Sequence, residues 1–240
     1  MDNKKTEIIK KLIGAEKLYG IMSLATKLPF ISANEKTGDN EIFLFDALEY
    51  AYTPLKKLKD DGNTVDIFEV DKATRMPFFA LLCTVGITSI IFNAESEEED
   101  RVPLNLFVKS PKELPETGQD WFENPELQLK AAYFMQDEAR NKVSDVLGKK
   151  QEEITKIFNK GTFLVIYNET GELPVVRFED HTRYVPVFTD LFAARQFATD
   201  GQVKLGALPG DKIPSILPPE TDGVIINPNT LCLRLNLCKE

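Results

Sequence analysis

The chain has 240 residues, with 29 Lys and Arg against 38 Asp and Glu, so its formal net charge is −9 at pH 7. Hydrophobic residues make up 42% of it, which is typical of a soluble globular protein with a core and excludes disorder as the default interpretation. The acidic excess argues against a nucleic-acid-binding protein that neutralises phosphates, and His181 is the only histidine, which excludes a metal site that needs two.

The compartment is predicted from the N-terminus and the cysteines. The first residues are polar and no signal-peptide core follows them, so secretion by that route is not expected. The longest apolar runs, such as 78–83, are too short to span a bilayer. Cys83, Cys232 and Cys238 are odd in number and lack a framework spacing, which fits a reducing cytoplasm. We therefore expect a cytoplasmic protein that does not bind membranes.

In the first 110 residues, helices and strands are predicted in alternation. Apolar residues recur near the helical period from Lys4 to Ala25, which predicts a helix that Gly14 and Gly20 can interrupt. Asp46, with Glu49 three residues later, predicts the N-cap of a second helix. The run 77–83 fits either a short helix or a buried strand. The predicted strands are 28–33, 41–45, 65–70, 89–93 and 102–108.

A change of composition separates this half from the next. Prolines and polar residues at 110–120 predict a linker. Asn124-Pro125-Glu126 predicts the start of a helix that stops at Gly148, and a second short helix is expected at about 150–159. From Thr162 onward the chain returns to strands, among them 173–178 and 183–188.

The two ends of the chain repeat the same landmarks in the same order. The predicted pairs are the turns 34–38 and 168–171, the strand ends Phe45-Asp46 and Phe188-Thr189, and the strand ends Asn93 and Asn227. This order predicts an α+β fold of two related mixed-sheet units with packed helices, joined by a helical connector. The predicted ranges are 1–110 for the first unit, 111–149 for the linker and connector helix, and 150–240 for the second unit.

Two stretches of the second unit carry a family resemblance. Residues 184–189, Tyr-Val-Pro-Val-Phe-Thr, lead into a predicted helix, and residues 223–228 read Gly-Val-Ile-Ile-Asn-Pro. Together they resemble the SseB protein N-terminal domain (enhanced serine sensitivity protein B) over about 150–238. The first unit resembles it only through the internal repeat, as a degenerate copy, and has Asn93-Ala94 where the second has Asn-Pro. The resemblance implies a mixed sheet packed by helices in a cytoplasmic bacterial protein, and it provides no catalytic residue, because the family has no settled activity.

Folding also explains these residues. Thr189 is predicted to cap the following helix, and the charge of Asp190 suits the helix dipole. Pro186 is expected to place its strand at an edge or a bulge, because proline cannot donate to a sheet.

Candidate contact residues lie in one charged cluster and in the linker. Asp180, His181 and Arg183, beside Glu179, form either a ligand or partner contact or a polar hairpin tip. Trp121 either covers an interface within the protein or anchors a partner. No catalytic, cofactor-binding or metal-ligating motif is found: 95–100 lacks the stride of a calcium loop, Cys83 lacks a basic neighbour, and no phosphate loop is present.

Three functions stay open, and the first is favoured. It is a non-enzymatic binding or adaptor protein of the SseB-like type, with a protein partner and no cofactor or nucleic acid. The second is a small-molecule ligand-binding or enzymatic domain that uses the 179–183 hairpin. The third is an acidic inhibitor or immunity-type protein that neutralises a basic effector.

Overall fold

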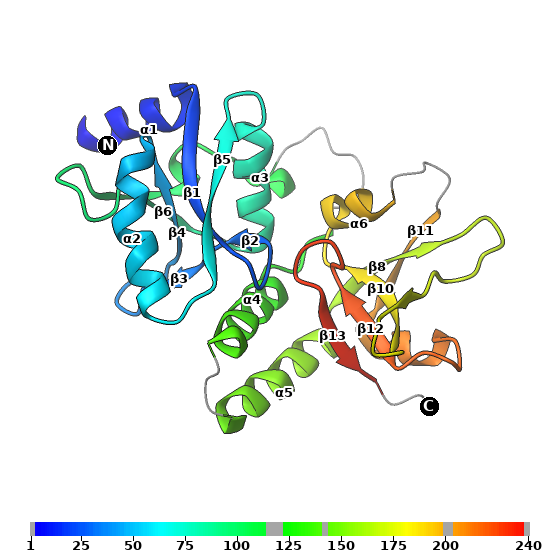
Figure 1. Cartoon of the computed structure of the whole chain (residues 1–240). Coiled ribbons are helices and arrows are strands. Elements are labelled where there is room, and N and C mark those ends of the chain that lie inside the picture. Colours follow the sequence, from blue (N-terminus) through cyan, green and yellow to red (C-terminus); the bar gives the residue numbers. More distant parts are fainter. Residues whose placement is uncertain (1–2, 114–121, 141–143, 199–203, 238–240) are drawn as a thin grey trace. The chain divides into compact units, whose positions relative to one another are not determined.

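The chain forms two units. The computed structural model describes residues 3–113, 122–140, 144–198 and 204–237 (Figure 1). Unit 1 comprises Met1–Gly118 and Gln136–Asn141, and unit 2 comprises Gln119–Met135 and Lys142–Glu240. Helix α4 (Pro125–Ala139) is therefore divided, with its first eleven residues in unit 2.

Unit 1 is a mixed sheet with helices (Figure 1). Its sheet order is β5-β1-β4-β6-β7; β4 and β6 are parallel and the other neighbours are antiparallel, and the short strands β2 and β3 pair with β1 and β4. The elements are α1 (Asn3–Gly14), β1 (Lys17–Ser23), β2 (Leu28–Pro29), β3 (Ser32–Ala33), β4 (Asn40–Phe45), α2 (Leu48–Asp60), β5 (Val65–Asp71), α3 (Arg75–Val85), β6 (Ser89–Phe92), β7 (Asp100–Pro103), and the 3-10 helices η1 (Leu104–Leu106) and η2 (Pro111–Glu113).

Unit 2 has its own mixed sheet in the order β11-β8-β10-β12-β13, with β9 also paired to β10. Here β10 and β12 are parallel and the other neighbours are antiparallel. The elements are α4, α5 (Ser144–Lys160), β8 (Thr162–Tyr167), β9 (Val176–Arg177), β10 (Arg183–Phe188), α6 (Leu191–Phe197), β11 (Lys204–Pro209), the 3-10 helix η4 (Gly210–Ile216), β12 (Gly223–Ile226) and β13 (Leu233–Asn236).

The two sheets have the same topology. Strands β1, β3, β4, β5, β6 and β7 of unit 1 correspond in order, pairing and direction to β8, β9, β10, β11, β12 and β13 of unit 2. The predicted α+β class with two related mixed-sheet units is confirmed. The equivalent turns differ from the predicted ones, however: 34–39 joins β3 to β4, whereas 168–171 follows β8, where unit 1 has the turn after β1.

Each unit buries an apolar face of its sheet under a helix, as expected for packed layers. In unit 1 Ala51 and Leu55 of α2 join a cluster with Ile21, Phe45 and Ile91 of the sheet. In unit 2 the cluster contains Ala194 of α6 with Leu164, Ile166 and Phe188.

The helix predicted over Lys4–Ala25 is wrong in its second half. The helix ends at Gly14, and β1 begins at Lys17 and pairs along its whole length with β5. Gly20 allows the Phe68 ring of β5 to pack against this strand, because a Cβ at Gly20 would lie 2.5 Å from that ring. The apolar pattern of a buried strand is too short to be distinguished from a helix by periodicity.

One other predicted helix boundary is corrected, and one open alternative is resolved. The helix predicted from Asn124 to Gly148 is two helices, and Gly148 lies within α5, where an added Cβ would meet nothing within 4 Å. Residues 77–83, ambiguous in sequence, belong to helix α3.

The predicted helix caps are displaced by one residue. The N-cap of α2 is Ala47, which forms no side-chain hydrogen bond to the helix. Asp46 instead accepts a hydrogen bond from Asn93 Nδ2 at 2.9 Å. In unit 2 the N-cap is Asp190, whose carboxylate accepts from the Ala193 N–H at 2.9 Å, and the Thr189 hydroxyl donates to that carboxylate.

Pro186 lies in a central strand, not at an edge. It is opposite Ile225 of β12, and its other side falls between the residues of β10 that pair with β9 and those that pair with β8. Its missing N–H therefore leaves no ladder bond unmade.

Candidate functional site

The charged cluster of the sequence lies in the loop between β9 and β10. The Phe178 N–H donates to Thr182 O at 3.0 Å, and the His181 N–H donates to Phe178 O, also at 3.0 Å. His181 has φ 66°, the left-handed conformation that closes such a turn. The predicted hairpin is present, but its first strand is shorter than predicted, since β9 comprises only Val176–Arg177.

Asp180 is held by three donors. The backbone N–H and the hydroxyl of Thr182 both donate to its Oδ1, and Arg234 Nη1 lies 2.6 Å from its Oδ2. The Thr182 hydroxyl, followed by the Arg234 guanidinium, lowers the pKa of Asp180 from 3.8 to about 2. The same pair raises the pKa of Arg234. Asp180 is therefore a fixed anion at neutral pH, unsuited to general acid catalysis.

Arg234 belongs to β13, and its side chain contacts the loop between β9 and β10. Its guanidinium lies 3.9 Å from the centre of the Phe178 ring and 5.8 Å from that of Tyr184. The Tyr184 hydroxyl donates to Asn236 Oδ1 at 2.8 Å, on the same strand. Arg234 is not among the residues predicted from the sequence, although the buried Leu233 and Leu235 on either side of it indicate a residue on the opposite face of a strand.

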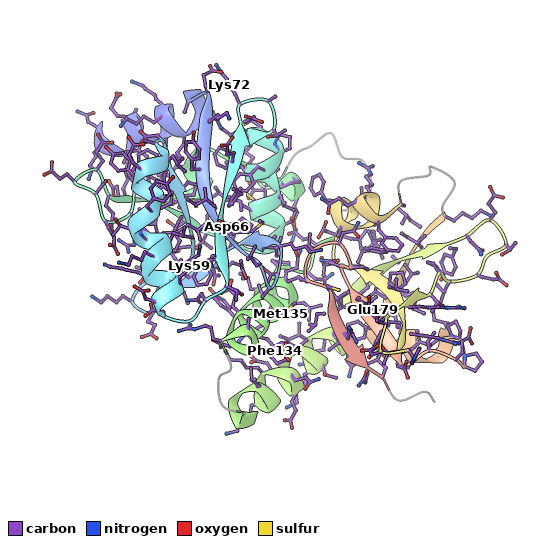
Figure 2. The ribbon with its side chains drawn as sticks, in the orientation of Figure 1. Lys59, Asp66, Lys72, Phe134, Met135 and Glu179 are labelled. Carbon is purple, nitrogen blue, oxygen red and sulfur yellow. The ribbon has the colours of Figure 1, made fainter. Side chains whose placement is uncertain are left out.

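A hollow of about 470 Å³ lies beside this cluster. It is lined by Arg177, Phe178, Glu179, Asp180 and Arg234. Glu179, labelled in Figure 2, is exposed. Of the predicted contact residues, Asp180 therefore lines a concave surface.

The other predicted contact residues do not join Asp180 in one catalytic constellation. Arg183 is engaged through its backbone: its N–H donates to Asp222 Oδ2 at 2.8 Å, and its carbonyl accepts from the Asp222 N–H at 2.7 Å. Over the described ranges, no carboxylate forms an ion pair with His181. Trp121 lies outside the described residues.

The described residues were also compared with the requirements of a metal site and of a membrane-spanning helix. Among them, no group of three His, Cys, Asp or Glu side chains is placed to hold a metal ion. None of the helices in this part of the chain is long and apolar enough to cross a membrane.

The two mixed sheets and the polar hairpin define a two-unit α+β protein with a candidate binding surface on unit 2. Residues 137–233 match the model of the SseB protein N-terminal domain, so the resemblance of the second half to that family is confirmed. The matched stretch is shorter than half of the chain and lies outside 1–110. That the first unit is a degenerate copy stays a prediction.

Comparisons with other proteins add little. No curated protein matches the sequence. Among solved structures, Tic22 from Plasmodium falciparum is 14% identical over 90% of each chain, with a TM-score of 0.23. Anabaena Tic22, described as a protein-transport protein, is 10% identical over 87% of this chain and 83% of its own, with a TM-score of 0.22. At these TM-scores neither likeness carries a conclusion about function.

Proposed function

We propose that this is a non-catalytic protein-binding protein, and that β11, which lies at one edge of the sheet of unit 2 while β13 lies at the other, accepts an extended segment of its partner. The match of residues 137–233 to the SseB protein N-terminal domain supports the general class. The observation that carries the proposal is the position of β11 (Figure 1): among the described residues it pairs with β8 alone and ends the strand order of its sheet. Strand addition to such an edge is a common mode of peptide recognition.

The backbone of β11 has groups available to a partner strand. The Gly210 N–H donates to Gly161 O at 2.8 Å, toward β8. Because backbone groups of an antiparallel strand alternate in direction, those of Leu205 and Ala207 point away from β8. Pro209 has no N–H and ends the run of donors. The edge therefore suits a short segment that bonds to Leu205 and Ala207.

The side chains of β11 are mostly exposed and uncharged. Four of its six residues are exposed, and Leu205 is 43% exposed. Its single charged residue is Lys204. Edge strands that must stay unpaired generally carry charges or a cover, and this one has little of either.

The equivalent edge strand of unit 1, β5, has different side chains and different neighbours. There β5 carries Asp66, labelled in Figure 2, and Glu69, which pairs with Lys17 at 2.6 Å. Helices α2 and α3 both contact β5, whereas the main contacts of β11 are with β8 and η4. Helix α6 has 7 residues where α2 has 13, and a 3-10 helix replaces α3. Two sheets of one topology thus differ in the charges and the helical contacts of this edge strand.

The acidic loop 95–100 gives less support to an inhibitor that neutralises a basic effector. Four of its five carboxylates already pair with cations of unit 1, at 2.6 to 3.8 Å: Glu95 with Lys57, Glu98 with Lys11, Glu99 with Arg101, and Asp100 with Lys4. These acids need not be matched by a partner.

A displayed library of random peptides, selected on the purified full chain, tests the proposal. We expect selected peptides to slow amide hydrogen exchange at Leu205 and Ala207. Ala207→Pro, which removes an outward N–H, is expected to weaken them at least about tenfold, or about 1.4 kcal/mol. Leu205→Glu leaves the backbone intact and is expected to weaken them too, while Asp66→Asn on the guarded edge of unit 1 leaves affinity unchanged.

Two results would overturn the proposal. One is a selection that yields no binding peptide. The other is a set of peptides whose protection maps away from β11 and whose affinity is unchanged in Leu205→Glu.

A further inference from the structure

Two arginines are directly opposite each other beside the hollow of unit 2. Arg177 of β9 is the register partner of Arg183 of β10. The adjacent pair, Phe178 and Thr182, is joined by a backbone hydrogen bond of 3.0 Å. Arg177 and Arg183 therefore form a non-hydrogen-bonded pair, in which Cα atoms are about 4.5 Å apart and side chains approach most closely. Like charges directly opposite on a sheet are destabilising.

Nothing in the described part of the chain offsets this repulsion with an ion pair. Neither Arg177 nor Arg183 has a carboxylate within 4.0 Å there, whereas Arg101 pairs with Glu41 at 3.1 Å and Arg234 with Asp180 at 2.6 Å. Arg177 is exposed and Arg183 half-buried.

The nearby acids are only partly available. Asp180 forms an ion pair with Arg234, and Asp222 Oδ2 accepts a hydrogen bond from the backbone N–H of Arg183. Glu179 lines the hollow with Arg177 but forms no ion pair with it. The guanidinium donors of the pair are therefore not used by these side chains.

We propose that Arg177 and Arg183 together bind one oxyanion, a phosphate or carboxylate group of a small molecule. Guanidinium groups match both oxyanions in shape, each offering paired N–H donors. Because Arg177 lines the hollow together with Glu179, the rest of the ligand extends from the arginine pair toward the free carboxylate of Glu179. Such a ligand carries an oxyanion at one end and a hydroxyl or ammonium donor for Glu179 at the other. This site is independent of the β11 edge.

Titration of the full chain with inorganic phosphate, and separately with acetate, tests the site. Side-chain Nε–Hε signals of Arg177 and Arg183 are expected to shift and saturate with at least one anion, and the relative affinities identify the preferred oxyanion. Arg177→Gln and Arg183→Gln should each weaken binding at least tenfold. Arg195→Gln, at an exposed arginine of α6, should not change it.

Glu179→Gln provides a readout of opposite sign, because removing a competing negative charge is expected to tighten binding. Shifts that grow linearly with both anions, or that are equal at Arg195, would mean ionic-strength effects and would overturn the proposal. Unchanged affinity in both arginine variants, with the fold intact by amide spectra, would overturn it as well.

Discussion

Asn93 and Asn227 have the same backbone conformation, φ 45°, and make the same hydrogen bonds at the ends of equivalent parallel strands. In each unit the asparagine N–H donates at 3.0 Å to the neighbouring strand, and its Oδ1 accepts at 3.1 Å from the amide just beyond that strand. The bonded pairs are Asn93 with Leu44 and Asp46, and Asn227 with Val187 and Thr189. Of the Asn-Pro pair in unit 2, the asparagine therefore makes the shared contacts, and Ala94 of unit 1 replaces only the proline.

Replacing Asn227 with Ala is expected to destabilise unit 2 by about 2–4 kcal/mol. The change leaves the buried Thr189 N–H without its acceptor and places a Cβ residue without a polar side chain in the left-handed region. Hydrogen exchange of the β10 and β12 amides measures the loss.

The control for this prediction is Asn227→Gly, which removes the side chain but adopts positive φ readily, and it should lose less than the alanine variant. Equal stability of the wild type and the alanine variant would contradict the assigned role.

The two helix starts are expected to respond differently to loss of an aspartate. Asp190→Ala removes the N-cap of α6 and leaves the Gln128 amide, which donates to Asp190 Oδ2 at 3.0 Å, without that partner. A loss of about 1–2 kcal/mol is expected, with faster exchange of the α6 amides. Asp46→Ala removes no cap, so the first amides of α2 should keep their exchange rates. Equal acceleration at both helices would show that the cap assignment is wrong.

Two glycines are expected to give opposite results when changed to alanine. A Cβ at Gly210 would lie 1.9 Å from the backbone oxygen of Phe158, so Gly210→Ala should destabilise unit 2 by about 1–3 kcal/mol or more. Gly148 lies in α5 with open space around it, so Gly148→Ala should stabilise the helix by up to about 1 kcal/mol. Chemical denaturation followed by circular dichroism measures both. Destabilisation by Gly148→Ala would contradict its place inside a helix.

The loop at Asp180 is expected to loosen in acid. Because the folded-state pKa of Asp180, about 2, is below its ordinary value of 3.8, its contribution to stability is present above about pH 4. That contribution is lost as the pH falls from about 4 through 2. Carbon-detected NMR titration of the carboxyl group measures the pKa directly.

Thr182→Val removes the hydroxyl that contributes most to this shift, so the pKa of Asp180 should rise toward its ordinary value. Arg234→Gln should raise it as well, and Lys212→Gln, elsewhere in unit 2, should not. An unshifted pKa in the wild-type protein would disprove the Asp180–Thr182–Arg234 arrangement.

The order of landmarks along the chain was sufficient to predict the α+β class and the two related units. Strand ends such as Phe45-Asp46 and Phe188-Thr189 are local patterns, and local patterns indicate where strands end and turns begin. The same reasoning located Asp180 and His181 in a hairpin, since polar residues between two apolar runs favour a turn.

Only the tertiary structure showed which strands pair with each other and which side chains that pairing brings together. Strand β1 had been predicted as helix, and β11 had no predicted strand, because each is defined by the strand beside it rather than by its own pattern. Arg234 is 54 residues from Asp180, and the pairing of β10 with β12 and of β12 with β13 brings them together. Sequence periodicity indicates which face of an element is apolar, but the register between strands decides which side chains meet. Register is specified when one face of the sheet is buried, which requires the folded sheet.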